Sequence, residues 1–128
     1  MFIIVKSKRM AQKYIEGDIV EYDNKVMAIK EPRDGSHFDL SCPKEGLVYC
    51  FVSVEDIAPI PITPEILKKN GWQEGYGIYY YDDVTVVPMD EGYCIIGLKE
   101  IADVLHINYI HQLQHFLFGL GLNSEMEV

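Results

Sequence analysis

Residues 108–122 read Asn-Tyr-Ile-His-Gln-Leu-Gln-His-Phe-Leu-Phe-Gly-Leu-Gly-Leu, and no other stretch of the chain has so strong a helical pattern. At 100° per residue the stretch predicts one amphipathic helix with an apolar stripe and a polar side. The stripe is predicted to hold Tyr109, Ile110, Leu113, Phe116, Leu117 and Leu120. The polar side is predicted to hold His111, Gln112, Gln114 and His115. Phe118 projects among these polar residues, so we expect another part of the protein or a partner to cover it.

The chain that carries this helix has 128 residues, of which 48% are hydrophobic and 24% are charged. This composition is typical of a folded protein with enough apolar material for a core. The segment Pro59-Ile60-Pro61-Ile62 is the natural boundary, because proline cannot donate to a strand ladder. We therefore expect two small subdomains, residues 1–58 and residues 59–128, which together could form one compact domain.

The first subdomain is predicted to consist of short strands joined by turns. A strand at residues 2–6 and a helical turn at residues 10–14 come first. A hairpin over residues 19–29 turns at Asp23-Asn24, and strands at residues 37–40 and 47–52 precede a final turn at residues 54–57. This order predicts a small bent sheet or barrel, and it resembles an SH3-like barrel in shape.

The second subdomain is predicted to mix helices and strands. Thr63 caps a short helix with Pro64 at its first position, and Asn70-Gly71 ends it. A hairpin over residues 78–87, a strand at residues 92–96 and a last strand at residues 124–128 follow from their alternation. Residues 98–107 fit a helix or a strand. The predicted fold class is thus α+β, with an SH3-like sheet packed on an α+β part that contains a β-meander and the main helix.

Charge favours a protein partner over nucleic acid. The formal net charge is −9, although residues 1–13 hold four basic side chains and no acid. The other 115 residues hold 7 basic and 20 acidic side chains, a balance that repels a phosphate backbone. We expect a partner with a basic surface and no direct nucleic-acid binding, with solubility as the simpler explanation of the charge.

Cysteine usage and hydropathy indicate a cytoplasmic protein. Cys42, Cys50 and Cys94 are odd in number and lack the Cys-x-x-Cys spacing of zinc and redox sites. Residues 2–5 are too short for a secretory signal, and no apolar run is long enough to span a bilayer, so no membrane association is expected.

Motifs for chemistry are weak. His111 and His115 lie one helical turn apart, and His106 could supply a third metal ligand, but no His-Glu-x-x-His sequence is present. The acidic pairs at residues 82–83 and 90–91 fall where turns are expected, and turn chemistry explains them. We therefore predict no catalytic residue, no cofactor and no enzymatic activity.

Two segments together resemble a known family. Pro59-Ile60-Pro61-Ile62-Thr63, followed by Gly71-Trp72, and Tyr109-Ile110-His111-Gln112-Leu113-Gln114 are similar to motifs of small uncharacterised proteins from phages, prophages and mobile elements of gut Bacteroidetes. The resemblance covers residues 59–128 and is looser before them. The chain departs from the family at His115 and at residues 119–122. The resemblance implies a phage-linked setting in a bacterial host cell, and it carries no catalytic residues.

These observations predict a non-enzymatic, phage- or mobile-element-encoded protein that binds another protein. In a sharper version, it is an acidic inhibitor that occupies the nucleic-acid channel of a host defence nuclease. The predicted partner-binding residues are His111, Gln114, His115 and Phe118 on the helix and Tyr79 and Tyr81 on the hairpin. The alternatives are a small metal-dependent enzyme using His106, His111 and His115, and a homo-oligomer that covers Phe118.

Overall fold

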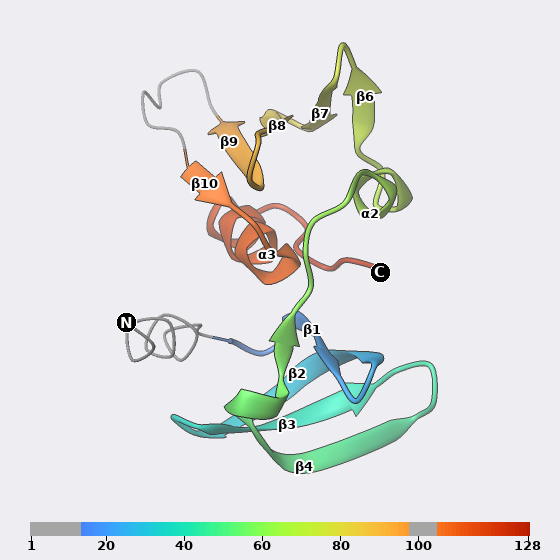
Figure 1. Ribbon diagram of the computed structural model, residues 1–128, viewed down its shortest axis with the longest axis vertical. Coiled ribbons are helices and arrows are strands. Elements are labelled where there is room, and N and C mark those ends of the chain that lie inside the picture. The colour runs from blue at the N-terminus through green and yellow to red at the C-terminus, as the bar shows by residue number, and fades with distance from the viewer. Residues whose placement is uncertain (1–13, 98–104) are drawn as a thin grey trace. The chain divides into compact units, whose positions relative to one another are not determined.

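The computed structural model describes residues 14–97 and 105–128 (Figure 1). The chain divides into two compact units, Met1–Ile60 and Pro61–Val128, two residues beyond the boundary expected from the prolines. The predicted strand at residues 2–6, the helical turn that begins at Met10 and most of the ambiguous segment 98–107 lie outside the described residues.

The first unit is a five-stranded antiparallel sheet with a short 3-10 helix. Its sheet order is β4-β3-β2-β1-β5, so β4 and β5 are the edges of the described sheet. The elements are β1 (Ile19–Tyr22), β2 (Lys25–Asp34), β3 (His37–Cys42), β4 (Leu47–Ser53), η1 (Val54–Asp56) and β5 (Ala58–Pro59).

Local turn chemistry sets the first hairpin. Asp23 and Asn24 adopt φ values of 53° and 60°, which is the left-handed geometry of a two-residue turn that matches strand twist. The predicted hairpin is confirmed. One face of the sheet then buries the core of the unit, which comprises Tyr14, Val20, Met27, Ile29, Phe38, Leu40, Cys42, Val52 and Ile57.

The second unit combines another five-stranded antiparallel sheet, of order β10-β9-β8-β7-β6, with two helices. The elements are α2 (Pro64–Lys69), β6 (Gln73–Gly75), β7 (Ile78–Tyr81), β8 (Val84–Pro88), β9 (Tyr93–Gly97), β10 (Leu105–Ile107) and α3 (Ile110–Gly119). The cap of α2 is confirmed, because the Thr63 hydroxyl accepts a hydrogen bond from the Ile66 N–H at 3.2 Å. Residues 105–107 are extended. The architecture of the protein is α+β.

The main helix is confirmed, but its buried face differs from the prediction. Ile110, Leu113 and Leu117 are buried as expected, and His111 and Gln114 are buried with them. Phe116 and Leu120 are only half-buried. Gln114 can enter the core because its side-chain N–H donates to the Ser124 carbonyl at 3.0 Å, which satisfies a polar group away from water.

The predicted strand over residues 124–128 is wrong, because this segment joins no ladder. The side chain of Asn70, at the end of α2, takes the place of a neighbouring strand. Its Oδ1 accepts from the Glu127 N–H at 2.7 Å, and its Nδ2 donates to the Glu127 carbonyl at 2.7 Å. This clamp fixes the segment so that Met126 is buried. Among the residues that the structure describes, no helix is long and apolar enough to cross a membrane.

Asn70→Ala should lower the free energy of unfolding of the second unit by about 1–3 kcal/mol, because it removes both bonds of the clamp. Urea denaturation followed by the fluorescence of the buried Trp72 measures this change. Asn123→Ala is the control, since its side chain accepts from the nearby Glu125 N–H in an exposed turn. Equal effects of the two substitutions would contradict the clamp.

Candidate functional site

Strands β3 and β4 pair with a bulge at the exposed side of the first unit. Phe38 pairs with Val52 and Leu40 pairs with Tyr49, so Cys50 and Phe51 together face Asp39. An extra residue of this kind bends the strand and redirects a side chain. Phe51 accommodates the bulge with a φ of 55°, a left-handed conformation that costs a non-glycine residue about 1–2 kcal/mol.

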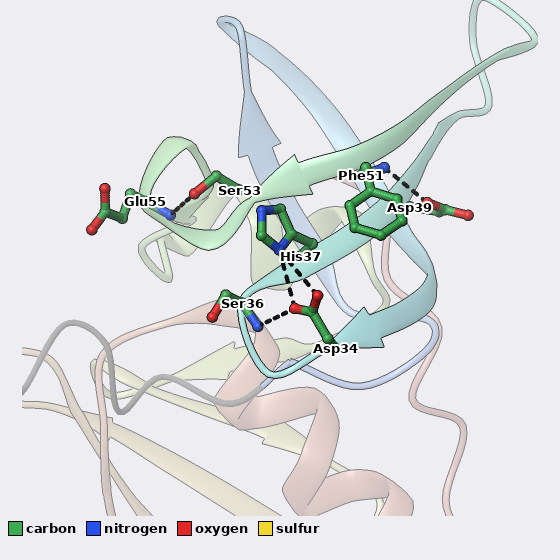
Figure 2. Close-up of polar contacts among 7 residues, drawn as sticks. All are labelled: Asp34, Ser36, His37, Asp39, Phe51, Ser53 and Glu55. Carbon is green, nitrogen blue, oxygen red and sulfur yellow. Dashed lines mark hydrogen bonds and ion pairs between the residues drawn. The ribbon is translucent and has the colours of Figure 1, made fainter.

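A buried carboxylate holds this bulge in place. Asp39 Oδ1 accepts from the Phe51 backbone N–H at 3.0 Å, which Figure 2 shows. Asp39 Oδ2 accepts from Arg33 Nε at 2.7 Å and from the terminal guanidinium nitrogen at 2.5 Å. The bonds from Arg33, and secondly that from Phe51, lower the pKa of Asp39 below its ordinary value of 3.8. One ionised carboxylate therefore joins β2, β3 and β4.

A second polar cluster supports the ring beside Phe51. The His37 ring lies 5.2 Å from the Phe51 ring, tilted by 46°. His37 Nδ1 is 3.1 Å from Asp34 Oδ1, which also accepts from the Ser36 N–H at 2.7 Å (Figure 2). The Ser36 bond first, and then His37, lower the pKa of Asp34 from 3.8. Asp34 is thus an ionised acceptor that orients the histidine.

Strand β4 exposes apolar side chains near this ring pair. Leu47 is 46% exposed, Val48 is 47% exposed and Phe51 is 60% exposed. Val48 pairs with Ser41, on the face of β3 that carries His37 and Asp39, whereas Leu47 pairs with Cys42 on the opposite face. We name Val48, Phe51 and His37 the Phe51 surface. Exposed apolar side chains that share one face of an edge strand indicate a binding surface. The Cys50 thiol is also exposed within this strand.

The sequence pattern predicts a strand at residues 47–52 but did not point to this site. The available signal was the absence of alternation, because all six residues Leu-Val-Tyr-Cys-Phe-Val are apolar. An edge strand with one buried face can cover only about half of such a run. Asp39 gave no signal, since its partners are Arg33 on β2 and the backbone of β4.

Three of the four predicted partner-binding residues on α3 do not form an exposed surface. His111 is 2% exposed, and burial first, with the nearby His115 second, lowers its pKa to about 4. Gln114 is buried, and His115 is half-buried with its ring centroid 5.7 Å from that of His111. Phe118 is 69% exposed, as its position predicted. The predicted surface reduces to Phe118 because the buried stripe extends toward His111.

The hairpin contributes even less of the predicted surface. Tyr79 is buried in the core of the second unit, and the half-buried Tyr81 stacks on Trp72 at 5.3 Å between centroids. Tyr80 points to the other side of the sheet and is exposed. The alternation of the three tyrosines was predicted, but Tyr79 faces the core.

The histidines of the predicted metal-site alternative are divided between elements. His106 lies on β10, where its Nε2 contacts the carbonyl of Glu91. His111 and His115 lie together on α3. Within residues 14–97 and 105–128, no group of three or more histidine, cysteine, aspartate or glutamate side chains is arranged to hold a metal ion.

The turn at Asp90-Glu91 borders an open cavity of about 810 Å³ in the second unit. Strands β9 and β10 place Cys94 directly opposite His106 at this cavity. The lining residues are Pro88, Met89, Asp90, Glu91, Cys94 and His106. Asp82 adopts a φ of 56°, a geometry that agrees with a turn role for the acidic pair Asp82-Asp83.

Comparison with known protein families finds no match for this chain, and neither does comparison with curated proteins or with solved structures. The suggested relationship to phage and mobile-element proteins therefore stays a prediction.

Asp39→Asn should change how the stability of the first unit depends on pH. Because the pKa of Asp39 is lowered in the folded protein, its ionised form contributes stability above the unfolded pKa, and this contribution is lost as the pH falls through the folded pKa. The stability difference between wild type and Asp39→Asn should be largest near about pH 6 and shrink below about pH 4. Urea denaturation followed by NMR signals of residues 19–59 measures it.

Glu31→Gln is the control for this experiment, because it removes only an exposed carboxylate 3.2 Å from the same guanidinium. It should leave stability nearly unchanged at every pH. A stability difference for Asp39→Asn that stays constant from about pH 6 to about pH 2 would contradict the role of the ionised Asp39.

Phe51→Gly should be more stable than Phe51→Ala by about 1 kcal/mol, because glycine adopts positive φ without the steric cost that alanine keeps. The matched pair is Val48→Gly and Val48→Ala, at an exposed position of the same strand where φ is not positive. There the order should reverse, with glycine less stable by about 0.5–1 kcal/mol. Denaturant midpoints of the four variants test both signs, and the same order at both positions would refute the strain.

Proposed function

We propose that this protein is a non-enzymatic protein-binding module that contacts its partner through the Phe51 surface. The observation that carries the proposal is Phe51 itself. Its backbone is held in an unfavourable conformation, and its ring is largely exposed. Neither feature stabilises the fold. Backbone strain that the surrounding structure maintains is typical of functional positions, and here the strain presents an aromatic side chain to solvent.

The Phe51 surface has the properties of a binding hot spot. An exposed aromatic ring that becomes fully buried contributes about 1.5–3 kcal/mol from apolar area alone. The bonds of Asp39 to Arg33 and to the Phe51 N–H fix the backbone before any partner arrives. Binding then costs less conformational entropy, because the backbone of the strand that carries the ring is already fixed. Val48, on the face of the sheet that carries His37, adds exposed apolar area.

Charge supports a partner with a basic surface. The formal net charge of the chain is −9, so the field of the protein is negative on average. Such a field steers a basic partner and suppresses acidic ones. In the sharper form of this proposal, the protein acts in the cytoplasm of a bacterial host as a phage- or mobile-element-encoded inhibitor of a defence nuclease. That setting comes from the resemblance of residues 59–128.

The SH3-like description of the first unit belongs to the same proposal. The sheet order β4-β3-β2-β1-β5 and the 3-10 helix η1 between β4 and β5 support it. This likeness is one of shape, and shape does not determine the ligand.

The two alternatives remain predictions. A metal-dependent enzyme would use His106, His111 and His115. A homo-oligomer would cover Phe118. Phe118 lies on α3 of the second unit, so it provides an independent exposed phenylalanine against which the Phe51 surface can be compared.

Capture from a bacterial host lysate tests the proposal with three baits, namely wild type, Phe51→Gly and Phe118→Ser. We expect wild type and Phe118→Ser to retain the same protein and Phe51→Gly to lose at least tenfold of it while staying folded. Retention should be stronger at about 50 mM salt than at about 500 mM salt, because an acidic surface attracts a basic partner. Mass spectrometry and the circular dichroism of each bait provide the readouts.

Loss of the retained protein with Phe118→Ser alone would move the binding surface to α3 and refute the proposal. Equal retention by all three baits would refute it as well. A change in the mass of the protein itself with Phe118→Ser, measured by light scattering, would favour the homo-oligomer.

A further inference from the structure

Three side chains that can bind a soft metal ion lie on one face of the second sheet. Strands β8, β9 and β10 are neighbours in that sheet (Figure 1). Cys94 on β9 pairs directly with His106 on β10 and with Val87 on β8. The adjacent Ile95 is buried in the core, so Cys94 lies on the outer face together with both of its partners. Met89 follows Val87 by two residues and therefore lies on this face as well.

The turn between β8 and β9 keeps Met89 close to this pair. The Met89 N–H donates to the Gly92 carbonyl at 3.0 Å, so the antiparallel pairing continues past the end of β8. The β-carbons of directly paired residues such as Cys94 and His106 are about 4.5–5.5 Å apart, and a diagonal neighbour such as Met89 is roughly 7–8 Å away. A methionine side chain has three rotatable bonds and can span that distance. All three side chains line the same open cavity of about 810 Å³.

A hydrogen bond to the backbone determines which nitrogen of His106 is available to a metal ion. His106 Nε2 contacts the carbonyl oxygen of Glu91. A carbonyl oxygen can only accept, so Nε2 carries the proton, and in the neutral ring the lone pair is on Nδ1. Metal-binding histidines usually donate their second nitrogen to a carbonyl or carboxylate in this way, which fixes the tautomer and orients the ring. His106 thus already makes the supporting hydrogen bond of a metal ligand.

The types of donor atom indicate which metal fits. Among the side chains that the structure describes, no three of the types histidine, cysteine, aspartate and glutamate are arranged to hold a metal ion, so a third protein donor must be of another type. The Met89 thioether is such a donor. Thioether and thiolate sulfur favour copper(I), and imidazole also binds copper, whereas zinc sites use thiolate, imidazole and carboxylate. Asp90 and Glu91 add negative charge at the cavity, which attracts a cation.

We propose that Met89, Cys94 and His106 form a binding site for copper(I), with the two sulfur atoms and His106 Nδ1 as ligands. Cys94 binds as the thiolate, and its proton passes to solvent when the metal binds. The ion can enter from the open side of the cavity, because Met89 is 53% exposed and His106 is exposed. The site lies within the second unit and does not involve the Phe51 surface, so it is independent of the proposed binding function.

Titration of the full chain with copper(I), without oxygen and in competition with a chromogenic copper(I) chelator, tests the site. Wild type should bind one copper(I) ion per chain. Met89→Leu, Cys94→Ser and His106→Gln should each lower the copper(I) affinity about tenfold or more, because each removes one ligand. Cys50→Ser is the matched control, since this exposed thiol belongs to the first unit, and it should keep the wild-type affinity. Circular dichroism checks that each variant is folded.

Silver(I), a soft and diamagnetic ion, supplies a second readout on the wild-type protein. In a chain with carbon-13-labelled methionine methyl groups, one equivalent of silver(I) should shift the NMR signal of Met89 and leave that of the fully buried Met27 in place. The Met89 signal is identified by its absence from Met89→Leu.

Unchanged copper(I) affinity in Met89→Leu or in His106→Gln would overturn the proposal, and so would a Met89 signal that silver(I) does not move. An equal loss of affinity with Cys50→Ser would also overturn it, because exposed thiols in general would then hold the copper.

Discussion

The buried carboxylate of Asp39 joins three strands of the first unit. Asp39 on β3 accepts hydrogen bonds from the Arg33 guanidinium on β2 and from the Phe51 N–H on β4, so three adjacent strands share one charged group. An ionised carboxylate removed from water without such partners would cost several kcal/mol. The Arg33 side chain is 43% exposed and connects this charge to solvent. The bulge places two residues of β4 opposite Asp39, and the N–H of one of them, Phe51, donates to the carboxylate.

Much of the fold was predictable from local signals. The Asp23-Asn24 turn, the Thr63 cap and the periodicity of residues 108–122 each depend on neighbouring residues, and the structure has the hairpin and both helices. The incorrect predictions concern segments whose structure is set by contacts between residues that are distant in the sequence. Gln114 is buried because the Ser124 carbonyl accepts from it, and residues 124–128 join no ladder because Asn70 clamps Glu127. Helical periodicity and strand alternation contain no information about such pairs.

The candidate site was less predictable than the fold for the same reason. Asp39 occupies an ordinary alternating position of β3, and its role emerges only when β2 and β4 lie on either side of it. Between the pairs Phe38–Val52 and Leu40–Tyr49, β3 has one residue and β4 has two. The bulge is therefore a property of the strand register. What the sequence did contain was the uninterrupted apolar run at residues 47–52. A strand at the edge of a sheet cannot bury such a run on one face.

Phe51 and Phe118 are both exposed, but they differ in the conformation of their backbone. Phe118 occupies a regular position on the solvent side of α3, where an exposed ring adds little strain. Phe51 combines exposure with positive φ, so its backbone raises the free energy of the folded protein while its ring gains little from burial. Asp39 and Arg33 offset this cost with charge-assisted hydrogen bonds, which are stronger than neutral ones. The hydrogen bonds of Asp39 and Arg33 thus maintain an unfavourable backbone conformation at Phe51. Burial of the Phe51 ring by a partner would explain why the protein keeps this conformation.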